Sequence, residues 1–291
     1  MRVSELQSPN CWSVLAQSVQ GASHVRRGEP NQDAIDTRQG AGNNPPLIVA
    51  VSDGHGSPKS FRSGCGARYA VKAAISECER LFCTGATNLT AIRRIAERQL
   101  SNAIVGEWER LVWGDMVDRP FTPRERRHFV AQFGVEAWRA LLLEPLVAYG
   151  ATLLFAFAAR QYVVLGQLGD GDIVTVTNEG CAARAFAADA RHFAGETASL
   201  CLKDAVKSFN VAFRVLKQEI PALILLSTDG YANSYQDDAD FMSVGPDLLA
   251  MLREESVESV QRDLASWLSE VSSGGSGDDI TLGVLCLLKV Q

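Results

Sequence analysis

The sequence predicts an α+β protein whose sheets are mostly antiparallel. Short apolar runs rich in β-branched or aromatic residues recur along the chain, and segments of helical character are clustered between them. Strands and helices do not alternate regularly, as they would in βαβ units with a parallel sheet. No internal repeat or low-complexity linker divides the 291 residues, so we expect a single domain over residues 1–291.

Strands are expected where short apolar runs are bounded by Gly, Pro or Asp. A shorter stretch, residues 34–37, also has strand character. The main runs are residues 12–19, 47–51, 151–165 with one break, 223–226 and 280–288.

Helices are expected where apolar residues recur three or four positions apart, because such residues share one helix face. Thr122 and Pro123, with Glu125 three residues after the threonine, form a capping box that begins a helix ending near Leu143. We therefore expect a mainly helical region over about 85–145. The other periodic segments are 67–81, 92–103 and 257–271.

Charge and composition argue against several classes of protein. Lys and Arg number 28 against 34 Asp and Glu, and the net charge of −6 does not favour a nucleic-acid partner. No apolar run approaches the ~18 residues of a membrane-spanning helix, and the N-terminal residues do not resemble a secretory signal. Seven scattered cysteines without a CxxC pair indicate neither a disulfide framework nor a zinc site. We expect a cytoplasmic protein without nucleic-acid or membrane partners.

Carboxylates stand at the ends of the predicted strands. In antiparallel sheets, the end of one strand lies beside the start of its neighbour. Aspartates that follow some strands and precede others therefore meet at one edge, and we expect five clusters to converge there. Those that follow strands are Asp53, Asp170 and Asp229, and those that precede strands are Asp33 and Asp278.

Such a convergence predicts a metal centre. Crowded carboxylates raise one another's pKa unless a cation lies between them, and oxygen ligands favour Mg²⁺ or Mn²⁺. Two such ions about 3.5–4 Å apart can activate water and polarise a phosphoryl group. A single Asp-Gly pair would indicate only a turn; its recurrence beside buried runs favours the metal. His55 in DGHG is either a loop histidine or a general acid.

The order of these motifs resembles that of the metal-dependent serine/threonine protein phosphatases of the PP2C (PPM) family, in particular bacterial PP2C-like members. The resemblance implies an α-β-β-α sandwich, in which helices flank two mostly antiparallel sheets, with a dinuclear Mn²⁺ or Mg²⁺ centre at one end. It covers nearly the whole chain, in the motifs GASHVRRGEPNQDA, VAVSDGHGS, GATLLFA, LGQLGDGDI, LLSTDGYANS and SGDDITLGVL.

The resemblance also implies roles for individual residues. Asp53 matches the bridging carboxylate, and the carbonyl of Gly54 lies beside it. Asp33 matches a ligand that reaches the metal directly or through water. Asp229 and Asp278 match the remaining ligands.

Other positions match the family less closely. Asp170 resembles the acidic residue of a third, weaker metal site, and Asp279 falls where the family often has Asn. Gln32 replaces a common Glu, which removes one negative charge from the metal site. Arg26 and Arg27 both qualify as the phosphate-binding arginine, and we favour Arg27.

The resemblance implies direct attack of a metal-activated water on phosphoserine or phosphothreonine in proteins, with Arg27 holding the phosphate and His55 protonating the leaving alkoxide. A segment at about 179–208 matches the variable flap. A cognate Ser/Thr kinase or its targets are the expected partners, in signalling. Two alternatives are a pseudophosphatase that binds phosphoproteins without turnover, which Gln32 favours, and a phosphatase of small phosphometabolites or phosphodiesters.

Overall fold

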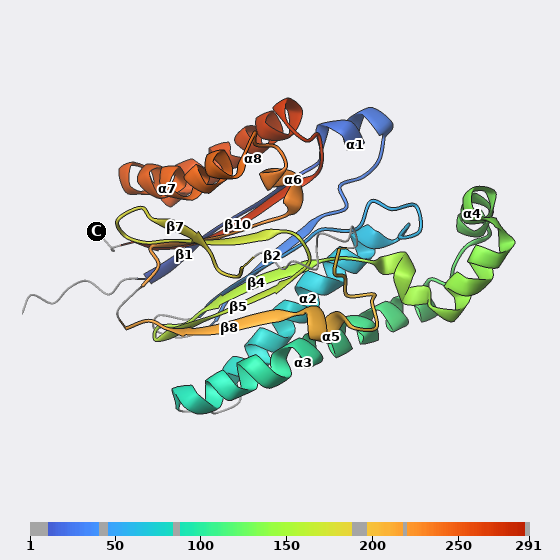
Figure 1. Ribbon diagram of the computed structural model, residues 1–291, viewed down its shortest axis with the longest axis horizontal. Helices are drawn as coiled ribbons and strands as arrows, with labels where there is room; N and C mark the ends of the chain where they lie inside the picture. Colours follow the sequence, from blue (N-terminus) through green and yellow to red (C-terminus); the bar gives the residue numbers. More distant parts are fainter. Residues whose placement is uncertain (1–10, 41–45, 84–87, 188–196, 218–219, 289–291) are drawn as a thin grey trace, which may run out of the picture.

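The computed structural model describes residues 11–40, 46–83, 88–187, 197–217 and 220–288. They form two five-stranded antiparallel sheets packed face to face, with helices against both outer faces (Figure 1). The expected α-β-β-α sandwich is confirmed.

One sheet joins the two ends of the described chain. Its first and last strands pair along their full length, from Cys11 opposite Leu288 to Val19 opposite Ile280. In spatial order its strands are β1 (Cys11–Val19), β10 (Ile280–Leu288), β9 (Leu223–Ser227), β6 (Asp172–Val176) and β7 (Ala182–Arg184).

The other sheet contains the most deeply buried strands. In β3 and β4 every residue is buried, because one face packs on the facing sheet and the other lies beneath helices. In spatial order the strands are β2 (Ala34–Gln39), β3 (Leu47–Ser52), β4 (Leu153–Ala158), β5 (Tyr162–Leu168) and β8 (Asn210–Val215).

All predicted strands are present, and the break in 151–165 separates β4 from β5. Three further strands, β6, β7 and β8, were not predicted. β7 has only three residues, and β8 is a half-buried edge strand without a strict apolar alternation. Such strands form mainly because a neighbouring strand offers hydrogen bonds.

Helices cover the outer face of each sheet. On the β2–β8 side lie α2 (Ser63–Cys83), α3 (Leu89–Asp118) and α5 (Ala205–Ser208), and α4 (Pro123–Leu143) and the 3₁₀ helix η1 (Pro145–Tyr149) continue from α3 (Figure 1). On the other side lie α1 (Ala22–Arg27), α6 (Asp229–Ala232), α7 (Asp238–Glu254) and α8 (Val257–Gly274).

The predicted helices are confirmed, and the sequence did not indicate α1, α5, α6 or α7. The capping box that begins α4 is formed in both directions between Thr122 and Glu125. The helix is interrupted at Gly134, whose φ of +85° suits only a residue without a side chain. None of the described helices has the length and apolar character needed to cross a membrane.

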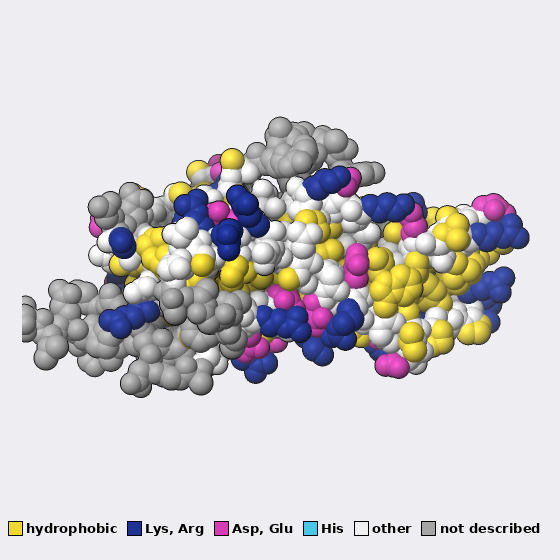
Figure 2. Space-filling view, turned by 90° about the horizontal axis from the view of Figure 1, so that it is seen from below, with side chains coloured by type: hydrophobic (Ala, Val, Ile, Leu, Met, Phe, Trp, Pro, Cys, Tyr) yellow, Lys and Arg dark blue, Asp and Glu magenta, His cyan; other side chains and the backbone are white. Residues whose placement is uncertain are grey.

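The α3–α4 region extends beyond the sandwich (Figure 1). Figure 2 shows apolar side chains gathered toward this end of the molecule. Exposed apolar residues on these two helices include Trp113, Val117, Leu142 and Leu143.

Candidate metal centre

Strand pairing brings the predicted aspartates to one end of the sandwich. Ser227, at the end of β9, pairs with Asp172 at the start of β6, and it also pairs with Leu282 near the start of β10. In the other sheet Ser52, at the end of β3, pairs with Ala34 at the start of β2. The aspartates that follow β3, β5 and β9 therefore share an edge with those that precede β2 and β10.

Three of the aspartates form a tight group. Carboxylate oxygens of Asp53, Asp170 and Asp229 all lie within 4.8 Å of one another. The backbone of Asp53 is held by Thr152, whose hydroxyl accepts a 3.0 Å hydrogen bond from Asp53 N–H. Gly54 forms an isolated bridge with the strand-like residue Ala151. This links the end of β3 to the start of β4 and directs Asp53 toward its neighbours.

Gly54 has no space for a side chain. A Cβ atom there would lie 2.6 Å from the carbonyl oxygen of Gln32 and 2.8 Å from the carbonyl carbon of Ser63. The loop after β3 therefore lies directly against the segment that leads into β2, and glycine allows this close approach.

Asp33 is buried beside Asp53. Its Oδ2 accepts a 2.8 Å hydrogen bond from the hydroxyl of Thr228, and it also hydrogen-bonds Thr281 and Asp53. Burial raises the pKa of Asp33 from 3.8 to about 7, and the hydrogen bonds from the two threonines only partly oppose this.

The neighbouring carboxyls are perturbed in the same direction. The pKa of Asp53 is well above its ordinary value, first because of burial and then because of the charges of Asp33 and Asp229. Burial, followed by the charges of Asp170 and Asp278, raises the pKa of Asp229 to about 6. Among the described residues, no Lys or Arg side chain forms an ion pair with Asp33, Asp53 or Asp229.

This donor set fits a hard divalent cation. It consists of carboxylate oxygens, and these lie closer together than their mutual repulsion favours without a positive charge. Mg²⁺ and Mn²⁺ both prefer such oxygen ligands.

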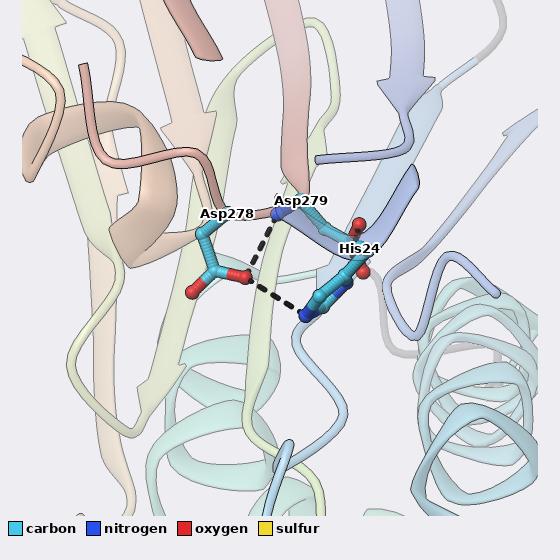
Figure 3. A group of neighbouring side chains, drawn as sticks. All are labelled: His24, Asp278 and Asp279. Carbon is cyan, nitrogen blue, oxygen red and sulfur yellow. Dashed lines mark hydrogen bonds and ion pairs between the residues drawn. The ribbon is translucent and has the colours of Figure 1, made fainter. Parts of the chain in front are cut away.

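Asp278 lies at the side of this group, next to a histidine. Its Oδ1 lies 3.6 Å from Nε2 of His24 (Figure 3). The same oxygen accepts a 2.9 Å hydrogen bond from the backbone N–H of Asp279. The charge of Asp278 contributes to the raised pKa of Asp229, which places the two carboxyls within electrostatic reach.

A family model described as protein phosphatase 2C matches residues 20–269 of this sequence. The chain belongs to the protein phosphatase 2C family. The match confirms the family that the motifs indicated, and with it the class of enzyme, a metal-dependent serine/threonine protein phosphatase. Among curated proteins, none matches the sequence.

Solved structures share the phosphatase 2C fold at low sequence identity. A bacterial serine phosphatase has a TM-score of 0.59 at 12% identity, covering 96% of this chain and 99% of the other. Serine/threonine phosphatase Stp1 from Staphylococcus aureus has a TM-score of 0.55 at 14% identity, covering 99% of both chains. The catalytic domain of PstP in complex with two manganese ions has a TM-score of 0.52 at 15% identity, covering 95% and 98%.

In this phosphatase 2C chain, Arg27 is engaged by a glutamate. Its Nε lies 2.5 Å from Oε2 of Glu29, and Glu29 in turn lies 3.9 Å from Nε2 of His24. Arg27 and His24 are three residues apart on α1 and so lie on the same face of the helix. Arg26 extends toward Gly277, since a Cβ atom built at that glycine would lie 3.7 Å from Nη2 of Arg26.

His55 lies on the loop after β3, where its backbone N–H donates a 3.1 Å hydrogen bond to the carbonyl of Gly150. Burial lowers the pKa of His55 below 6.5, and the charge of Asp170 only partly opposes this. The imidazole is therefore mainly neutral at pH 7.

Gln32 is directed toward a helix rather than into the carboxylate group. Its Oε1 accepts a 2.8 Å hydrogen bond from the hydroxyl of Ser63, at the start of α2. The replacement of Glu by Gln therefore keeps an acceptor that links the segment before β2 to α2.

A cavity of roughly 740 Å³ opens beside Asp170 and Asp229. Arg184 lines it together with two carboxylates, and its guanidinium pairs with Asp172 and with Asp238. Residues 188–196 of the expected flap lie outside the described residues. The residues that follow this gap adjoin the carboxylate group, since Thr197 Oγ1 donates a 2.7 Å hydrogen bond to Asp170.

Three residues around these carboxylates were not predicted from the sequence. Thr152 and Thr228 hold Asp53 and Asp33, and their positions beside the GAT and STDG motifs were the available signal. His24 is 6% exposed and faces Asp278 and Asp279. It carried no usable signal, because its partners lie at the far end of the chain.

Proposed function

We propose that this chain hydrolyses phosphoserine and phosphothreonine with two cations, Mn²⁺ or Mg²⁺, held by Asp33, Asp53, the Gly54 carbonyl, Asp229 and Asp278. The observation that carries this assignment is the grouping of Asp53, Asp170 and Asp229 within 4.8 Å. Asp170 is the candidate for a third ion, because it belongs to this group and is exposed.

The cations supply Lewis-acid activation of water and neutralise phosphate charge when bound. The protein's own residues fix the ligands in advance. Asp33 is held by Thr228, and Asp53 is held through its backbone by Thr152. Pre-arranged ligands favour catalysis because little reorganisation is needed during the reaction.

Arg27 is the proposed phosphate-binding residue. It shares a helix face with His24, which faces Asp278, and its guanidinium can hold a phosphate through two parallel hydrogen bonds. Binding requires the phosphate to share Arg27 with Glu29 or to replace that carboxylate.

His55 is the proposed general acid for the leaving alkoxide. It lies on the same loop as Asp53, within electrostatic reach of Asp170. A general acid matters most for a basic leaving group such as an alkoxide, so this role predicts that the effect of His55 depends on the leaving group.

We also propose that residues 1–291 form one domain, with the helical region at about 85–145 and a flap at about 179–208 that selects phosphoprotein substrates. The cavity beside Asp170 supports the position of the flap. A cognate Ser/Thr kinase, or its targets, would link the enzyme to signalling. We also propose a cytoplasmic location, where free cysteines such as Cys65, Cys78 and Cys201 stay reduced.

The pseudophosphatase alternative depended on Gln32. The side chain of Gln32 hydrogen-bonds Ser63 and does not enter the carboxylate group, so this residue no longer favours the alternative. Nothing in the described cavity favours a phosphodiester or a small phosphometabolite.

The direct test is hydrolysis of phosphoserine and phosphothreonine peptides with Mn²⁺, with Mg²⁺ and with a chelator, for the wild type and Asp53→Asn. We expect turnover only with the metal and the intact carboxylate. Full activity in the chelator would falsify the proposed mechanism. A preference for a diester chromogen over phosphopeptides would contradict the proposed substrate class.

A further inference from the structure

We propose that Asp279 is a positioning residue, assisted by His24, that sets the spacing of the metal ligands Asp33 and Asp278. The inference rests on the proposed metal centre. It assigns a task to the carboxyl that stands where the family often has an amide.

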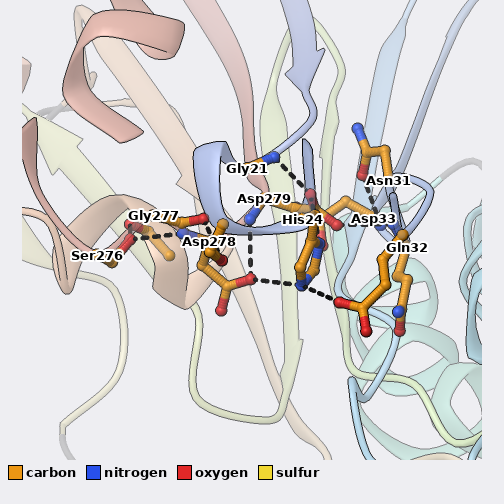
Figure 4. Close-up of polar contacts among 12 residues, drawn as sticks. Gly21, His24, Asn31, Gln32, Asp33, Ser276, Gly277, Asp278 and Asp279 are labelled. Carbon is orange, nitrogen blue, oxygen red and sulfur yellow. Dashed lines mark hydrogen bonds and ion pairs between the residues drawn. The ribbon is translucent and has the colours of Figure 1, made fainter. Parts of the chain in front are cut away.

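The Asp279 carboxylate is 4% exposed and joins segments that are distant in sequence. Its Oδ1 accepts a 2.6 Å hydrogen bond from the backbone N–H of Gly21, the N-cap residue of α1. Its Oδ2 accepts a 2.7 Å hydrogen bond from the backbone N–H of Gln32, the residue before Asp33. Figure 4 shows these residues around Asp279. One carboxylate thus ties the start of α1 and the segment before β2 to the loop that carries Asp278.

An asparagine cannot make both contacts. Each oxygen of Asp279 accepts from a backbone N–H, whereas an Asn side chain has one accepting oxygen and one donating NH₂ group. In an Asn variant, the NH₂ group faces one of the two N–H donors. One of these two N–H groups is then left without an acceptor, and the segment that carries it is expected to shift.

The packing at Gly21 makes the spacing sensitive to such a shift. A Cβ atom at Gly21 would lie only 2.3 Å from the carbonyl carbon of Asp278, so the two backbones are in direct contact. Ser23 adds a 2.8 Å hydrogen bond from its N–H to the carbonyl of Gly277. The start of α1 therefore supports the backbone of the ligand Asp278.

His24 connects the positioning residue with the ligand. Its Nδ1 lies 2.9 Å from Oδ1 of Asp279, although not along the line that a hydrogen bond requires, and its Nε2 lies 3.6 Å from Oδ1 of Asp278 (Figure 3). Oδ1 of Asp278 also accepts the N–H of Asp279. Within the described residues Oδ2 of Asp278 has no such partner, so it is the oxygen available to a cation.

The test is calorimetric Mn²⁺ binding to full-length wild type and Asp279→Asn, with the metal-free melting temperature measured beside it. We expect the Asn variant to bind Mn²⁺ about 10–100-fold more weakly, the usual effect of losing a group that orients a metal ligand. We expect kcat at saturating Mn²⁺ to change less than the metal affinity.

Asp115→Asn is the matched control. Asp115 is also a buried carboxylate, and it accepts hydrogen bonds from Tyr69 and Tyr149 on elements without proposed ligands. Its loss should lower the melting temperature without changing Mn²⁺ affinity. Equal Mn²⁺ affinity in Asp279→Asn and the wild type would overturn the proposal.

His24 variants keep the proposal testable if Asp279→Asn does not fold. His24→Asn places an amide nitrogen near the position of Nδ1, and His24→Gln places one near Nε2. If His24 acts through Asp279, the Asn variant should bind Mn²⁺ more tightly than His24→Ala and His24→Gln. Wild-type affinity in His24→Ala would remove His24 from the proposal. Mn²⁺ binding without phosphopeptide turnover in the wild type would refute the proposed function while leaving the positioning role intact.

Discussion

The hydroxyl of Thr228 donates a 2.8 Å hydrogen bond to Oδ2 of Asp33, a residue 195 positions earlier in the chain. Thr228 follows β9 in one sheet, and Asp33 precedes β2 in the other. The same hydroxyl accepts a 3.0 Å hydrogen bond from the N–H of Thr281. One threonine therefore connects the two sheets at the edge where the carboxylates meet.

Thr228→Val should destabilise the metal-free protein. Valine keeps the shape but leaves the buried N–H of Thr281 and Oδ2 of Asp33 without this partner, which costs about 1–3 kcal/mol. Urea unfolding measures the change in free energy. Thr175→Val is the control, because Thr175 is half-buried and its hydroxyl donates only a 3.2 Å hydrogen bond to the exposed carbonyl of Ala183. Equal losses of stability in the two variants would contradict the role of Thr228 in connecting the two sheets.

The metal-free protein should lose stability as the pH rises from about 4 to about 7. The folded-state pKa of Asp33 is about 7 and that of Asp229 is about 6, both above the ordinary 3.8. Between these values the folded state binds more protons than the unfolded state, so the free energy of unfolding falls with rising pH. The stability that these protonated carboxyls contribute is present in full below the ordinary pKa of 3.8 and is lost above the folded-state pKa.

Urea unfolding in a chelator across this pH range measures that slope. Asp33→Asn, which cannot ionise, should flatten it and stabilise the metal-free protein near pH 7.5. Mn²⁺ should stabilise the wild type most at that pH, where the carboxylates are ionised, and should stabilise Asp33→Asn less. A wild-type stability that is independent of pH in the chelator would contradict the crowding of the carboxylates.

His55→Gln should affect phosphopeptides far more than p-nitrophenyl phosphate. An alkoxide leaving group needs a proton, and loss of a general acid typically costs about 10²-fold or more in rate. The nitrophenolate leaves without one, so its turnover should change little. Steady-state kcat for the two substrates gives the ratio. Equal losses would show that His55 contributes before the leaving group departs.

Arg27→Ala should raise KM for phosphopeptides by about 10- to 100-fold, since one charge-assisted contact to phosphate contributes about 1.5–3 kcal/mol. Inhibition by inorganic phosphate should weaken in parallel, because the same guanidinium would hold the free anion. Arg26→Ala is the matched control and should leave both values nearly unchanged. A larger effect of Arg26→Ala would reassign the phosphate contact to the arginine beside Gly277.

Local patterns were sufficient to predict the aspartates and most of the elements that carry them. The run at 47–51 followed by Asp53, and Asp278 before the last strand, were predicted from apolar character and neighbouring glycines. The capping box at Thr122 depends on residues three apart, so its geometry is also local. An antiparallel arrangement then brings strand ends together without further information.

The tertiary structure alone decided which residues hold these aspartates in place. Gly21 and Asp279 are 258 positions apart, and they meet because β1 pairs with β10 in one register. The half-buried edge strand β8 likewise depends on β5 as its partner. Periodicity along a chain determines which face of an element is apolar. Contacts between chain ends are determined by sheet register and packing, and they are what place His24 against Asp278.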